Sequence, residues 1–205
     1  MPPEGTAPLL RLAAAAPLLE VLDWWHSNQY DIAAAAGGHP HLRELHISGQ
    51  AEAWRRATPR LSALSILRLY SPPDLFGAVE GVGVGGASAR GRRLGTWLTQ
   101  CERLTNLDLR ASEQHVSAHE LLAAVGAAVG GRLRFLTLRN VQPPLTCDAA
   151  ATAVHTLLAC YPHLEVLSLC WHHSIKATAE ALSRQLLLTV PAVAPLCPAL
   201  REVRV

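Results

Sequence analysis

The sequence predicts an α/β fold, a right-handed solenoid curved like a horseshoe, with a parallel sheet on its concave side and helices on its convex side. Three observations predict it. A pattern of three aliphatic residues, the second three positions and the third five positions after the first, occurs six or seven times in 205 residues. Successive occurrences begin 22 to 40 residues apart, which leaves room for a return segment between strands. Helix capping and stop signals lie in several of these intervals.

Each occurrence of the pattern predicts one short strand. We call its first aliphatic residue the anchor; the second and third point into the core and alternate with residues on the other face. The anchors are Leu19, Leu42, Leu64, Leu104, Leu133, Leu164 and Leu200. The predicted strands lie near residues 21–24, 44–47, 66–69, 106–109, 135–138, 166–169 and 202–204. Because one such unit cannot bury its own apolar side, neighbouring units must stack.

The third anchor has an alternative. Leu61 begins the same pattern three residues earlier, and that choice would reassign every side chain of the strand. We place the anchor at Leu64, because Leu67, Leu69 and Tyr70 otherwise have no role.

The intervals between the later anchors predict helices. Ser117 and Glu120 have the spacing of a capping box, apolar residues follow on one helical face, and Gly130 with Gly131 ends the helix. Further helices are predicted from Asp148 to near Pro162, from about Thr178 to Pro191, and, short or distorted, around 51–56. We expect residues 1–205 to form a single domain of six or seven repeats. Residues 81–93, rich in Gly and Arg, are expected to form a mobile loop inserted at its edge.

The pattern and its lead-ins resemble the leucine-rich repeat family. The longer spacings are similar to the ribonuclease-inhibitor type, and a proline two residues before an anchor is similar to the cysteine-containing repeats of F-box substrate adaptors. These prolines are Pro17, Pro40, Pro162 and Pro198. The position after the strand that the family often fills with Asn or Cys holds Ser27, Gln50, Ser112, Val141 and His172, which excludes a continuous asparagine ladder. The resemblance implies a binding protein, although the fold serves many unrelated partners.

Composition limits which cellular compartment and which classes of binding partner the protein is expected to have. The 18 basic residues nearly balance the 16 acidic ones, so no general field attracts nucleic acid or a membrane surface. Five cysteines without C-x-x-C spacing favour the cytoplasm or another reducing intracellular compartment. Glu4 and two prolines precede the first apolar residues, which argues against a signal peptide. No apolar run reaches the roughly 18 residues of a membrane-spanning helix.

We assign no catalytic, cofactor-binding or metal-binding residue, and we do not expect an enzyme. The glycines of 81–86 match a dinucleotide fingerprint as a string, but the preceding segment does not predict the strand that this motif requires. His115 lies outside the predicted helix that contains His119, so the pair lacks zinc-binding geometry. The adjacent His172 and His173 point in opposite directions on an extended chain, although Cys170 is close by.

The function that the sequence favours is a non-catalytic scaffold for protein interactions, a subunit of a larger assembly, with protein partners on the concave face. The residues predicted to bind a partner there are Trp25, Glu44, His46, Ser48, Arg68, Tyr70, Asn106, Asp108, Arg110, Phe135, Thr137, Arg139, Glu202 and Arg204. Large aromatic side chains among them are typical of residues that dominate interface energies.

Two alternatives remain open. An RNA-associated structural subunit would use Arg90, Arg92, Arg93, Arg110 and Arg139. The recognition repeats of an F-box-type adaptor would require a helical segment that does not precede the first repeat here. Because the last pattern stops on Val205 without a return helix, we also expect the C-terminal edge of the sheet to be covered, either by a partner subunit or by further residues of a longer protein.

Overall fold

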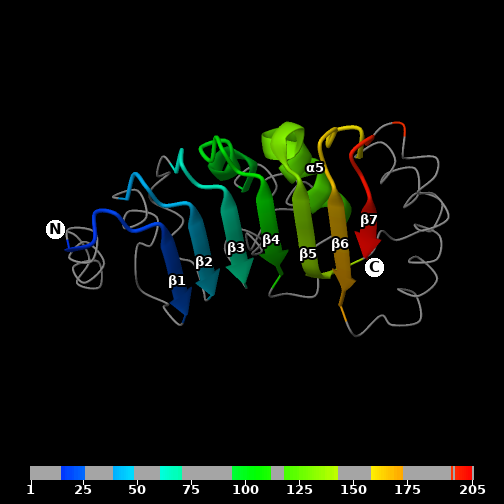
Figure 1. The fold of residues 1–205 in the computed structure, drawn as a ribbon. Helices are drawn as coiled ribbons and strands as arrows, with labels where there is room; N and C mark the ends of the chain where they lie inside the picture. The colour runs from blue at the N-terminus through cyan, green and yellow to red at the C-terminus, as the bar shows by residue number, and fades with distance from the viewer. Residues whose placement is uncertain are drawn as a thin grey trace.

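In the computed structural model, the strands form one parallel sheet in chain order (Figure 1). The structure describes residues 15–25, 39–48, 61–70, 94–111, 118–142, 158–172, 195 and 197–204. Within them the sheet has seven strands: β1 (Val21–Trp25), β2 (Glu44–Ser48), β3 (Ile66–Tyr70), β4 (Asn106–Arg110), β5 (Phe135–Val141), β6 (Val166–Trp171) and β7 (Glu202–Arg204). Each strand pairs in parallel with the next. The predicted α/β class, the parallel sheet and all seven strand positions are therefore confirmed.

The anchor of the third strand is Leu64, as predicted. Leu67 pairs in register with Leu45 on one side and Leu107 on the other, so the inward residues of β3 align with those of its neighbours. Leu61 is also buried, but as the residue that opens the turn before the strand: its carbonyl accepts a hydrogen bond from the Leu64 amide at 3.1 Å. Both leucines are in the core, which explains why the pattern fits either position.

Two repeated sets of backbone hydrogen bonds hold the sheet in register. In six of the turns the anchor amide donates to the carbonyl three residues earlier; the pairs are Leu19 and Ala16, Leu42 and His39, Leu64 and Leu61, Leu104 and Cys101, Leu164 and Tyr161, and Leu200 and Cys197. The carbonyl of the residue just before each of β1 to β6 then accepts hydrogen bonds from two amides of the next unit, as the Glu20 carbonyl does from Arg43 and Glu44. These bonds fix where each strand begins relative to its neighbour.

The core consists of aliphatic rows that run across the sheet. One row joins the first inward residue of successive strands and contains Leu22, Leu45, Leu67, Leu107, Leu136 and Leu167, each at most 6% exposed. A second row contains Ile47, Leu69, Leu109, Leu138 and Leu169. The anchors Leu42, Leu64, Leu104, Leu133 and Leu164 form a third. The inward rows occupy one side of the sheet, and we call the opposite side the open face.

Helix α5 (Ala118–Val129) adds Leu121, Leu122, Val125 and Val129 to this core, as the sequence predicted. It lies behind β5 and β6 in Figure 1, and a 3₁₀ turn (Gly130–Arg132) follows it. Residues 94–98 form a short helix that the sequence did not predict, with Leu94, Trp97 and Leu98 buried. The helices predicted at 51–56 and 178–191, all of the helix from Asp148 except its last turn, and the loop at 81–93 lie outside the described residues.

Candidate functional site

The open face is built from the first, third and fifth residue of each strand, because strand side chains alternate between the two sides. The strand register aligns them in three rows. The first row contains Val21, Glu44, Ile66, Asn106, Phe135, Val166 and Glu202. The third-residue row contains Asp23, His46, Arg68, Asp108, Thr137, Ser168 and Arg204. The fifth-residue row contains Ser48, Tyr70, Arg110, Arg139 and Cys170.

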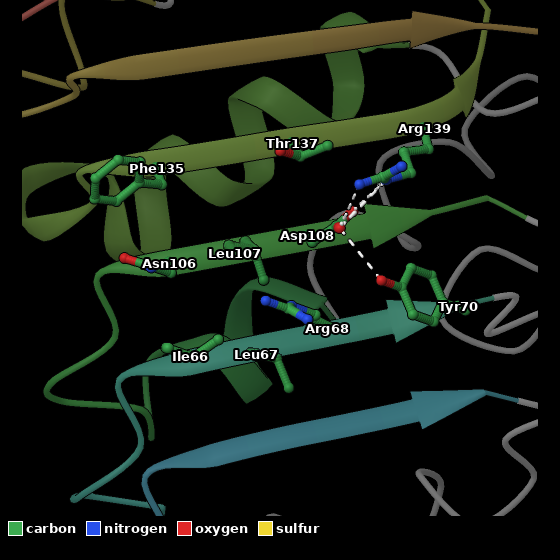
Figure 2. Close-up of a pocket in the computed structure, with 10 residues that line it drawn as sticks. All are labelled: Ile66, Leu67, Arg68, Tyr70, Asn106, Leu107, Asp108, Phe135, Thr137 and Arg139. Atoms are coloured by element: carbon green, nitrogen blue, oxygen red, sulfur yellow. Dashed lines mark hydrogen bonds and ion pairs between the residues drawn. The ribbon is translucent and has the colours of Figure 1, made fainter. Parts of the chain in front are cut away.

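A hollow of about 350 Å³ lies on this face over β3, β4 and β5 (Figure 2). This volume is at the small end of the range of protein ligand sites, ~300–1,000 Å³. The hollow is lined by Ile66, Leu67, Arg68, Tyr70, Asn106, Leu107, Asp108, Phe135, Thr137 and Arg139. Its walls therefore combine apolar, aromatic, amide, hydroxyl and charged groups of both signs.

Asp108 is the centre of the polar network in the hollow. The Arg139 guanidinium donates from Nε at 3.0 and 3.2 Å to the two carboxylate oxygens, and from a terminal nitrogen at 3.0 Å. The Tyr70 hydroxyl donates to the same carboxylate at 3.4 Å. Dashed lines in Figure 2 mark these contacts across three adjacent strands. A fork of this kind between arginine and carboxylate fixes direction as well as distance.

The network also shifts the ionisation of its members. The hydrogen bond to Asp108 raises the pKa of Arg139, which therefore stays charged. Partial burial raises the pKa of Tyr70, and the nearby Asp108 charge adds to that shift, so its hydroxyl stays protonated and can donate. The Arg139 guanidinium therefore keeps its charge and the Tyr70 hydroxyl keeps its proton, so both can donate to the Asp108 carboxylate.

Two arginines beside this frame have no ion pair among the described residues. Arg68 is the register partner of Asp108 on β3, yet the Asp108 oxygens are held by Arg139 and Tyr70. Arg110 ends β4 and pairs in register with Arg139 on the next strand. Both side chains are exposed. Their positive charges are therefore available on the open face.

A backbone irregularity adjoins the hollow. Asn140 follows Arg139 with a φ of 60°, a left-handed conformation that asparagine tolerates better than most residues, and the pairing of β5 with β6 shifts register there. Its side-chain amide donates to the Ala111 carbonyl at 2.8 Å. Bulges next to sites often redirect a neighbouring side chain. Here the bulge directly follows Arg139, which donates hydrogen bonds to Asp108.

The opposite end of the open face carries negative charge. His46 on β2 lies between Asp23 on β1 and Glu44 on its own strand, with nitrogen to oxygen distances of 3.7 Å to each. The His46 side chain is 13% exposed, whereas that of Asp23 is 48% exposed. The charge of the sheet thus reverses between β1–β2 and β3–β5.

The structure gathers half of the predicted partner-binding residues in one place. Arg68, Tyr70, Asn106, Asp108, Phe135, Thr137 and Arg139 line the hollow. Arg110 adjoins it, while Glu44, His46 and Ser48 lie on β2 outside it. Trp25 is in β1, in register with Ser48, and its side chain lies outside what the structure describes.

Glu202 and Arg204 are distant from the hollow and pair with each other, with an Nε to Oε1 distance of 2.6 Å. Their strand, β7, is one edge of the sheet, and Val203 is only partly buried. The partner contact expected at this edge stays a prediction. The arginines at 90–93, which the RNA alternative would use, lie outside the described residues.

The predicted partner-binding set leaves out several residues of the open face, among them Asp23 and Ile66, and it also leaves out Asn140 beside the hollow. Asp23 and Ile66 occupy the same strand positions as their predicted neighbours. Applying the alternation of strand side chains to every repeat would therefore have found them. Asn140 was missed because a left-handed residue inside a strand has no pattern beyond the presence of the asparagine itself.

The described residues offer no group of three His, Cys, Asp or Glu side chains that could hold a metal ion. Cys170 is exposed on the open face, whereas His172 is buried. Among the described helices, none has the length and apolar character needed to cross a membrane. Comparisons of the chain with protein-family models, with curated proteins and with solved structures find no match.

Proposed function

We propose that this protein is a non-catalytic scaffold whose open face binds a protein partner, and that its parallel units form a leucine-rich repeat solenoid. The observation that carries the function is the hollow over β3–β5, where the Tyr70 and Phe135 rings, the Asp108–Arg139 ion pair and Arg68 come together on three strands in register. Arg110 adjoins the hollow, and neither it nor Arg68 has an ion pair among the described residues. Residues on rigid strands present a binding surface that loses little conformational freedom when a partner docks.

The chemistry of the face fits a polypeptide. It mixes both signs of charge with hydroxyl, amide and apolar groups, as protein interfaces do, with Phe135 and Tyr70 as aromatic anchors. The Arg134 guanidinium lies 5.8 Å from the centre of the Phe135 ring and helps to hold it in place. Nucleic-acid binding would favour a continuous positive track. Asp23, Glu44 and Asp108 interrupt such a track here.

Affinity capture from an extract of the source cells tests the proposal. Thr137 lines the hollow from the middle of β5, so Thr137→Tyr should fill the hollow without changing charge. We expect the variant to lose most of the protein captured by the wild-type chain. Ser62→Tyr, which adds the same ring to an exposed turn, should capture as the wild type does.

Thermal unfolding followed by circular dichroism would verify that both variants remain folded. The extract is used before and after nuclease treatment, because RNA could bridge bait and prey. Capture that survives the nuclease and depends on Thr137 supports the scaffold. Capture that disappears with the nucleic acid, or is unchanged in Thr137→Tyr, contradicts it.

A further inference from the structure

We infer that the partner presents an acidic segment to the open face, and that Arg68 and Arg110 bind its carboxylates beside the Asp108–Arg139 pair. The inference rests on the proposed function and specifies the chemistry of the partner. Its starting point is the charge count over β3–β5: Arg68, Arg110 and Arg139 against Asp108 leave an excess of two positive charges on the described surface.

The arrangement of these charges favours a bound anion. Arg110 and Arg139 are register partners on adjacent parallel strands, which lie ~4.8 Å apart, and like charges placed side by side destabilise a sheet. Asp108 neutralises Arg139 only, through three contacts of 3.0 to 3.2 Å. Arg68, on the other side of Asp108, has no ion pair within the described residues. An anion over the hollow would satisfy both arginines at once.

The groups around the arginines suit a carboxylate on a short aliphatic stem. Figure 2 shows the Arg68 guanidinium lying between β3 and β4, with the Asn106 and Thr137 side chains on the same face. The Asn106 amide and the Thr137 hydroxyl can donate to an oxygen, and Ile66 and Phe135 offer apolar contact for methylene groups. Planar guanidinium groups match the two oxygens of a carboxylate.

The same face disfavours a long polyanion. A nucleic-acid strand would continue past the hollow, and toward β1 it would meet Asp23 and Glu44. A polypeptide can place acidic residues over β3–β5 and neutral or basic residues over β1–β2. An acidic peptide is therefore the class of ligand that the charge distribution favours over RNA.

Fluorescence anisotropy with a short labelled oligoglutamate tests this directly. The wild-type chain should bind it, and bind oligolysine of the same length far more weakly. Arg68→Gln and Arg110→Gln should each weaken binding by about fivefold to tenfold, the range expected for a charged hydrogen bond that solvent partly screens. Arg103→Gln removes an equal charge from the exposed turn before β4 and should leave the affinity unchanged.

Cysteine alkylation read by mass spectrometry locates the bound peptide. Cys170 is exposed on the open face and pairs in register with Arg139, whereas Cys160 is exposed in the turn before β6. Bound oligoglutamate should slow alkylation of Cys170 and leave Cys160 unaffected. Absence of oligoglutamate binding, an equal loss in Arg103→Gln, or protection of Cys160 instead of Cys170 overturns the inference.

Three further outcomes separate the possible failures. If an oligouridylate binds more tightly than oligoglutamate and depends on the same arginines, the surface belongs to nucleic acid and the inference is wrong. Thr137→Tyr could abolish protein capture while the double variant with Arg68→Gln and Arg110→Gln does not reduce it. That result would support the scaffold function and contradict only the proposal that the partner segment is acidic. If Thr137→Tyr leaves capture unchanged, the proposed function itself fails.

Discussion

At the scale of single residues, Gly130 shows how closely the 3₁₀ turn after α5 approaches the turn before β6. A Cβ atom on Gly130 would overlap the Cys160 carbonyl oxygen, whereas one on Gly131 would meet nothing within 4 Å. The Tyr161 hydroxyl fixes the same contact by donating to the Leu122 carbonyl of α5 at 2.5 Å. We expect Gly130→Ala to lower the free energy of unfolding by ~1–3 kcal/mol, as overpacking does. Gly131→Ala should change it by less than ~1 kcal/mol, and urea unfolding of both variants measures the difference.

Asn140 is a second position where the structure favours one residue type, because both its backbone conformation and its side-chain hydrogen bond suit asparagine. Its φ of 60° costs any residue with a Cβ except Asn and Asp about 1–2 kcal/mol, and its side chain also bonds to the Ala111 carbonyl. Asn140→Ala should therefore destabilise the protein by ~1–3 kcal/mol, and Asn140→Gly, which relieves the strain but loses the bond, by less. If the bulge also positions Arg139, both variants should weaken oligoglutamate binding. Chemical denaturation and anisotropy check the two effects separately, and an Ala variant as stable as the Gly variant would contradict the strain.

At the scale of elements, β5 has one face in the core and one on the open face. Leu136 is fully buried between Leu107 and Leu167, and its neighbour Thr137 points the other way. Leu136→Ala removes buried methyl groups and leaves a cavity, so it should cost ~2–5 kcal/mol of unfolding free energy. Thr137→Ala should cost about 1 kcal/mol or less. Equal effects of the two substitutions in urea unfolding would contradict the assignment of the two faces.

Strands β5, β6 and β7 are also joined by an ion-pair triad just before they begin. Glu165 accepts from Arg134 on one side and Arg201 on the other, and the hydrogen bond from Arg134 is the main reason why its pKa lies below the usual value. Because the pKa is lowered in the folded state, the stabilisation is complete above the unfolded pKa of ~4.3 and is lost as pH falls through the folded value.

Glu165→Gln should therefore be less stable than the wild type at pH 7, and the gap should close as the pH falls below about 4. Unfolding in urea at a series of pH values measures the gap. Glu102→Gln is the matched control, because Glu102 is exposed and has no ion pair among the described residues. A gap for Glu165→Gln that does not depend on pH would mean that the carboxylate contributes by packing alone.

At the scale of the whole molecule, the strand positions were predictable because aliphatic residues at a fixed spacing mark each strand, and these residues are buried. The short helix at 94–98 was not predictable from the sequence, because five residues are too few to show a periodic pattern. The sequence predicts which strand residues point outward around the hollow. It does not predict which of them pair with one another. Asp108 faces Arg68 directly in register, with Arg139 on the diagonal, yet the structure pairs it with Arg139. Sequence cannot decide between partners that long side chains reach equally well.

Protection against hydrogen exchange should vary across the whole sheet. Strands β3, β4 and β5 pair on both sides and their inward leucines are at most 2% exposed, whereas β1 and β7 are the edges of the described sheet. On β1, Val21 is 49% exposed, and β7 has only three residues. Segments with few buried contacts open at lower free energy than the core. Amides of β3–β5 should therefore exchange more slowly than those of β1 and β7, as read by mass spectrometry. Protection of β7 equal to that of β4 would contradict this gradient and indicate that another element or a second copy of the chain covers the edge.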